Sequence, residues 1–169
     1  MIRIKNRKGS DGRINETGKP GSPSRILDVR DADFFENVED GIKSTVRAVI
    51  SSGFETISSC QGHNDLGYVN RTVSLLLESD EIIYWRTMIA DLNIVNGFRR
   101  PIKYFVSNYK DGIKKFMIIF GSVQDMKETE LKQQAFDKTV PKIIKEYYGS
   151  KCLNTADYAY SGIHIDEFY

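Results

Sequence analysis

A cluster of small polar and reactive residues occupies positions 58–63 of this 169-residue chain. It reads Ser58, Ser59, Cys60, Gln61, Gly62 and His63. Cys60 and His63 bring a thiol and an imidazole, which serve in acid–base, nucleophilic and metal chemistry. Gly62 lets the backbone approach a ligand closely or adopt a positive φ. Because the cluster follows a short apolar run, it predicts a site where a strand ends, with Cys60 and His63 as catalytic candidates.

Backbone N–H groups in a glycine-containing loop can form a nest that binds a phosphate, carboxylate or oxyanion. The expected ligand-binding residues are Ser58, Ser59, Gln61, Gly62 and Arg71. Arg71 is included because arginine pairs well with such anions and because it begins the next predicted strand. Plainer interpretations stay open, namely a packed Cys60, a structural or exposed His63 and a solvated Arg71.

Cys60 and His63 are also spaced closely enough to bind one metal ion. The chain has one further cysteine and one further histidine, Cys152 and His164. A tail folded over the loop would assemble a Cys2His2 zinc site, but the spacing of the second pair matches no recognised finger pattern. Zinc bound by these four residues is therefore not expected. Nucleotide-binding glycine motifs and the common hydrolase motifs are also missing from the sequence, so the cofactor stays unassigned.

Composition points to an ordinary globular protein, with 40% hydrophobic and 28% charged residues. Two cysteines are too few for a disulfide scaffold and indicate a reducing, cytoplasmic setting. No apolar run reaches the roughly 18 residues of a membrane helix. The formal net charge of +1 argues against a strongly basic nucleic-acid module.

The charge is nevertheless uneven along the chain. Residues 1–24 carry six basic and two acidic side chains, a net charge of +4, together with several glycines and prolines. This composition predicts a flexible basic segment, followed by one domain over residues 25–169. The segment is either a solvated tail or an arm that contacts RNA phosphates.

Hydrophobic spacing predicts a first helix that begins with Asp33 and Glu36 as a capping box and ends at Gly53. Strands are expected over 54–59 and 68–78, then a helix capped by Asp80 and ended by Gly97. Strands over 102–107 and 113–120 flank an Asp-Gly turn. A last helix is expected over 123–138, broken or kinked at Pro141 and resumed over 141–148.

This order does not alternate helices and strands strictly, and it contains at least one antiparallel hairpin. It favours the α+β class, as a two-layer sandwich in which helices cover one face of a mostly antiparallel sheet.

The segment from Thr56 to His63 resembles the Thr-Ser-Ser-Cys-Ser-Gly-Arg segment of the tRNA wybutosine-synthesis methyltransferase family. The resemblance covers about residues 31–78, with Gln61 and His63 in place of the family's serine and arginine. It implies an α+β fold, S-adenosylmethionine as cofactor and a modified guanosine in tRNA as substrate. Similar Ser-Cys-x-Gly-His loops are familiar from short proteins of phage and mobile-element genomes.

Three hypotheses follow. The leading one is a cytoplasmic domain that binds a small anionic or nucleotide-like ligand at residues 58–63. The second is an S-adenosylmethionine-dependent transferase that modifies RNA or nucleotides, with residues 1–24 contacting RNA. The third is a protein-interaction module, such as an inhibitor, immunity or defence-related protein. Whether the chain is an enzyme stays open, as does its oligomeric state.

Overall fold

The computed structural model describes residues 13–15, 24–26, 34–36, 38–64 and 69–143. Its main sheet has four strands in the spatial order β3-β4-β6-β5, and every neighbouring pair is antiparallel. The strands are β3 (Glu55–Cys60), β4 (Asn70–Leu77), β5 (Lys103–Asn108) and β6 (Lys114–Ser122). Two sequential hairpins therefore form the sheet, and β6 lies between β4 and β5.

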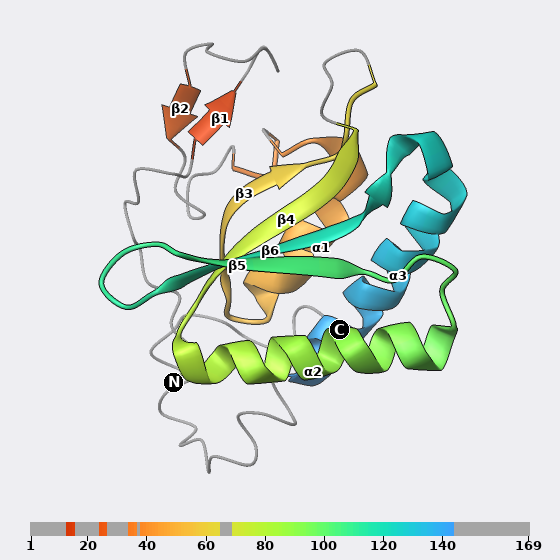
Figure 1. Cartoon of the computed structure of the whole chain (residues 1–169). Helices are drawn as coiled ribbons and strands as arrows, with labels where there is room; N and C mark the ends of the chain where they lie inside the picture. Colours follow the sequence, from red (N-terminus) through yellow and green to blue (C-terminus); the bar gives the residue numbers. More distant parts are fainter. Residues whose placement is uncertain (1–12, 16–23, 27–33, 37, 65–68, 144–169) are drawn as a thin grey trace.

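Three helices cover one face of this sheet (Figure 1). They are α1 (Asp40–Ser51), α2 (Ser79–Asn96) and α3 (Met126–Ile143), with a 3-10 turn, Val123–Asp125, before α3. The predicted α+β class, with a mostly antiparallel sheet and helices on one face, is confirmed.

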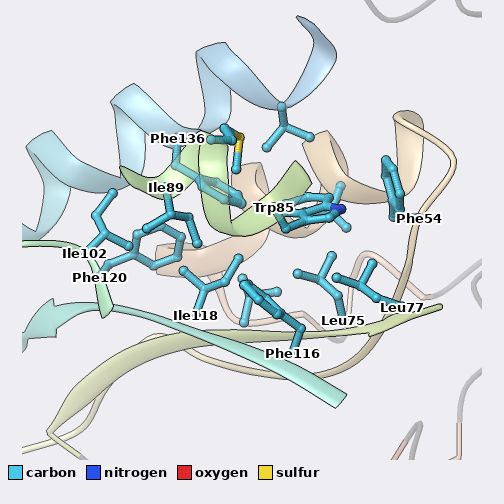
Figure 2. Packing of buried hydrophobic residues seen from close by; sticks show 14 of the residues in the cluster. Phe54, Leu75, Leu77, Trp85, Ile89, Ile102, Phe116, Ile118, Phe120 and Phe136 are labelled. Atoms are coloured by element: carbon cyan, nitrogen blue, oxygen red, sulfur yellow. The ribbon is translucent and has the colours of Figure 1, made fainter. Parts of the chain in front are cut away.

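The core lies between the two layers and is centred on Trp85 of α2, which is fully buried (Figure 2). The Trp85 ring meets Phe54 edge-on at 5.0 Å between centroids and lies 5.9 Å from Phe136 of α3. From the sheet side, Phe116 of β6 approaches the same ring at 6.5 Å. Aromatic pairs at such separations add to the stabilisation from apolar burial.

The first helix starts later than the sequence pattern predicts. Phe34–Glu36 form a turn, and α1 begins at Asp40 with Glu39 as its N-cap residue. The predicted start at Asp33 is therefore wrong. Ile42, Val46 and Val49 form the buried stripe of α1 as expected, and Phe35 packs against the core from outside the helix. The apolar spacing continues through the turn, which explains the overlong predicted helix.

The N-terminal end of α2 also differs by two residues from the prediction. Its N-cap is Glu78 rather than Asp80, and Glu78 and Glu81 form a reciprocal capping box. The helix ends at Gly97, as predicted, and this glycine has the left-handed conformation common at helix ends. The turn between β5 and β6 is also as predicted, because Asp111 and Gly112 both have positive φ.

The last helix runs through Pro141 to Ile143, so of the two predicted outcomes at this proline, a break or a kink, the break is wrong. Proline removes one backbone hydrogen bond and crowds the preceding turn, yet the helix continues for two residues beyond it. The predicted continuation over 144–148 and the end at Gly149 lie outside the described residues.

Two short strands lie in the N-terminal region, and no strand was predicted there. β1 (Arg13–Asn15) pairs antiparallel with β2 (Ser24–Ile26) in a separate two-stranded sheet. The rest of residues 1–24 lies outside the described residues. Among the described helices, none combines the length and the hydropathy required to span a bilayer.

Candidate functional site

Three side chains with different chemistry meet where α1 begins and β3 ends. Glu39 precedes α1, Cys60 is the last residue of β3, and His63 lies three residues further on. One carboxylate oxygen, the thiol sulfur and one ring nitrogen all lie within 4.8 Å of one another. We call these residues the Glu39–Cys60–His63 cluster. All three are half-buried, so the cluster is in contact with solvent.

The shortest contact in the cluster joins Glu39 to His63. Oε1 of Glu39 lies 2.5 Å from Nε2 of His63, with the two side chains 34% and 22% exposed. The carboxylate therefore orients the ring and favours a proton on the facing nitrogen. An imidazole held in this way can transfer a proton or, once that proton is lost, bind a metal ion.

The loop amides that the sequence assigned to an external anion hold internal groups. The backbone N–H of Gln61 donates to Oε2 of Glu39 at 2.7 Å. The N–H of Gly62 donates to the sulfur of Cys60 at 3.4 Å. One loop amide thus binds an anion, the carboxylate of Glu39 from the residue before α1, and the other contacts the sulfur of Cys60.

Gln61 fixes the loop against α1 and β4 through three separate groups. Besides its N–H, its carbonyl accepts from Nε of Arg71 at 3.0 Å, and its side-chain Oε1 accepts from the N–H of Gly41 at 2.9 Å. A Cβ at Gly41 would lie 2.9 Å from Cβ of Gln61 and 2.8 Å from Nη2 of Arg71. The glycine in the first turn of α1 therefore makes room for the loop.

Arg71 lies behind the loop and is only 6% exposed. Its Nη1 donates to Oε1 of Gln133 on α3 at 2.8 Å. Gln133 in turn donates to the carbonyl of Gly41 and to the hydroxyl of Thr45, both at 2.9 Å. This chain of hydrogen bonds joins α3, β4, α1 and the loop, so the cluster is positioned by the whole fold.

The backbone beside the cluster is locally irregular. Gly62 has φ +88°, and a Cβ there would meet Cγ1 of Val123 at 2.5 Å. The β3–β4 register shifts between Thr56 and Ser58, and the β4–β6 register shifts just after Arg71. Such shifts re-aim side chains and are frequent near functional sites.

Burial raises the pKa of the Cys60 thiol, and the hydrogen bond from Gly62 partly offsets this effect. Through space, the charge of Glu39 raises the same pKa further and the charge of Arg71 lowers it. At neutral pH, Cys60 without a bound metal is therefore a thiol, which is a weak nucleophile. This disfavours a cysteine nucleophile in the ligand-free site.

The predicted site residues are only partly brought together. Cys60, Gln61, Gly62, His63 and Arg71 all belong to the cluster or to the hydrogen bonds that support it. Ser59 is half-buried, whereas Ser58 is exposed. Cys152 and His164, the remaining members of the four-residue zinc hypothesis, lie outside the described residues.

Sequence reasoning missed two important members, Glu39 and Gln133. Glu39 was assigned to the interior of a helix, because the apolar spacing placed the helix start at Asp33. The sequence does contain a second group of acidic residues, Glu39 and Asp40, followed by Gly41. This group could have indicated that the helix begins at Asp40 and not at Asp33. The sequence gives no comparable signal for Gln133. A glutamine in a helix is usually exposed, and its buried partner Arg71 lies 62 residues away in the sequence.

Comparison of the chain with models of known protein families, with curated proteins and with solved structures gave no match. The function of the cluster is therefore inferred from its geometry and chemistry.

Proposed function

We propose that this chain is a small-ligand-binding domain whose site is the Glu39–Cys60–His63 cluster and whose ligand carries an anionic group. The observation that carries the proposal is the convergence of carboxylate, thiol and imidazole on a loop that partly buried hydrogen bonds hold in place. A small number of precisely placed polar groups, together with a group whose pKa is shifted, is a common feature of ligand sites.

The charge of Arg71 supports an anionic ligand. Its hydrogen bonds go to neutral oxygens of Gln61 and Gln133, and no carboxylate of a described residue lies within ion-pair distance. A cation that is 6% exposed is poorly solvated and gains from a nearby negative charge. The positive charge of Arg71 also lowers the pKa of the Cys60 thiol, which shows that the charge acts at the cluster.

Thermal stabilisation of the full chain tests this proposal. The probes are inorganic phosphate, AMP and, as a neutral match to AMP, adenosine. A ligand at one hundred times its Kd stabilises the folded state by about 2.7 kcal/mol. We expect phosphate or AMP to raise Tm and adenosine to have no effect.

The two histidines of the chain offer a matched pair of variants. We expect His63→Gln to lose the stabilisation and His164→Gln to retain it. Equal responses in both variants would place the ligand elsewhere and overturn the proposal.

S-adenosylmethionine is included as a separate probe. Stabilisation by this compound, with RNA binding that weakens steeply with salt, would support the transferase hypothesis instead. No response to any of the probes would favour the protein-interaction module.

A further inference from the structure

We infer that the Glu39–Cys60–His63 cluster is a binding site for a divalent transition-metal ion, and that Zn²⁺ is the ion that its donors fit best. Thiolate, imidazole and carboxylate together form a typical zinc donor set, and catalytic zinc sites commonly have three protein ligands. The inference rests on the proposed function in one respect only, which is that both use this cluster.

The donor atoms need only small movements to bind one ion. Tetrahedral zinc with ordinary bond lengths places its donor atoms about 3.3–3.7 Å apart. In the structure all three atoms lie within 4.8 Å of one another, and Glu39 and His63 lie closer than such an ion requires, at 2.5 Å. Oε1 and Nε2 would therefore separate by about 1 Å, with the ion taking the place of their shared proton.

Groups behind the donors already hold them as the outer partners of metal ligands do. The N–H of Gln61 binds the carboxylate oxygen of Glu39 that faces away from His63. The N–H of Gly62 points to the sulfur of Cys60, which suits a metal-bound thiolate. Outer-shell hydrogen bonds of this kind fix ligand orientation and contribute to metal affinity.

Metal binding also explains how a site that contains Glu39 can accept an anion. Zn²⁺ would bind a neutral imidazole, the carboxylate and the thiolate that forms when Cys60 releases its proton to solvent. The charges of the ion and its three ligands then cancel, and Arg71 leaves the surroundings positive. A fourth coordination position remains for water or for an anionic group of the ligand.

Titration of the metal-free full chain with Co²⁺ and Zn²⁺ tests the inference. We expect one equivalent of Co²⁺ to produce cobalt–thiolate absorption and Zn²⁺ to displace it. Cys60→Ser should abolish the thiolate band, and Glu39→Gln and His63→Gln should each weaken Zn²⁺ binding at least 10-fold. Asp40→Asn is the matched control, because Asp40 follows Glu39 directly and its side chain is 95% exposed.

The variants Cys152→Ser and His164→Gln decide whether the tail supplies ligands. Unchanged titrations with both support the three-donor site. Loss of the metal in either variant would overturn it and indicate the Cys2His2 arrangement. Undiminished binding in the Cys60, Glu39 and His63 variants, or no binding to the wild-type chain, would equally refute the inference.

A second measurement separates this inference from the proposed function. Phosphate and AMP binding are measured on chelator-treated and on Zn²⁺-loaded protein. If the chain binds the metal but neither phosphate nor AMP, the metal site is supported and the proposed function is refuted. If the chain takes up no metal and binds phosphate or AMP equally well with and without a chelator, the proposed function is supported and the metal site is refuted.

Discussion

Glu39 and His63 lie 24 residues apart in the sequence, yet the carboxylate of one contacts the imidazole of the other at 2.5 Å. The contact joins the start of α1 to the loop after β3. It depends on Gln61, whose N–H holds the second oxygen of the same carboxylate.

Replacing Glu39 by Gln should destabilise the chain modestly. The variant loses a charge-assisted contact to His63 but keeps an amide oxygen for the N–H of Gln61. Because both side chains are partly exposed, we expect a loss of about 1 kcal/mol in the free energy of unfolding. Urea-induced unfolding measures it, with Asp40→Asn as a control that should lose much less stability, because its contact with Lys43 is exposed to solvent. An equal loss in the control would show that first-turn charge, not the contact, is responsible.

Replacing Gly41 by Ala should also destabilise, against the usual helix preference. Alanine normally favours a helix by about 1 kcal/mol over glycine. Here its Cβ would lie 2.8–2.9 Å from groups of Gln61 and Arg71 that are held by hydrogen bonds. We expect the clash to prevail, with a net loss of about 1–3 kcal/mol in urea unfolding. A stabilised variant would show that the loop is free to move away.

Trp85 should tolerate phenylalanine far better than alanine. Its ring is fully buried, but its Nε1 has no hydrogen-bond partner among the described residues. Trp85→Ala should destabilise by about 3–5 kcal/mol through the cavity it leaves. Trp85→Phe loses ring volume and no hydrogen bond, so about 1–2 kcal/mol is expected. Similar losses in the two variants would mean that the indole N–H does bind an acceptor.

Asp137 on α3 makes stability depend on pH in an unusual direction. Burial raises the pKa of Asp137, and the nearby hydroxyl groups of Thr45 and of Ser44, which donates a hydrogen bond to the carboxylate, only partly offset this effect. The folded state therefore retains a proton that the unfolded state has already released. Stability is full below the usual aspartate pKa and falls as the pH rises from there through the folded-state pKa.

Asp137→Asn removes this titration and keeps an oxygen that can accept from Ser44, which donates to Asp137 at 2.8 Å. The variant should therefore melt at a higher temperature than wild type near neutral pH and at the same temperature in acid. Thermal unfolding across the pH range checks it. A variant that is less stable at neutral pH would show that the charged carboxylate is needed.

Much of the fold was predictable because its signals are local. The buried stripe with Trp85 on α2, the glycine end of that helix and the Asp-Gly turn each depend on residues close together in the sequence. Helix starts were less predictable. Apolar spacing continues from Phe35 into α1 across a turn, and charged residues near the start of α2 offered several equivalent caps.

The site was predictable in its loop but not in its surroundings. Cys60, Gly62 and His63 stood out because reactive and conformationally special residues are adjacent in the sequence. Glu39 and Gln133 reach the site only through tertiary structure. Their roles change the chemistry, because an internal carboxylate occupies a backbone donor that the sequence assigned to an external anion.

The link from Gln133 through Arg71 to the loop has a consequence for how the site is lost. Gln133 lies in the helical layer and contacts none of Glu39, Cys60 and His63. It nevertheless accepts a hydrogen bond from Arg71, and Arg71 donates another to the carbonyl of Gln61 in the loop. Local fraying of the loop would cost Arg71 its hydrogen bond to the carbonyl of Gln61 and leave Nε of this buried guanidinium without that acceptor. We therefore expect the loop to open only when the helical layer also moves. Hydrogen exchange at Gln61 and Gly62 should then be as slow as in the centre of the protein, a rare property for a surface turn.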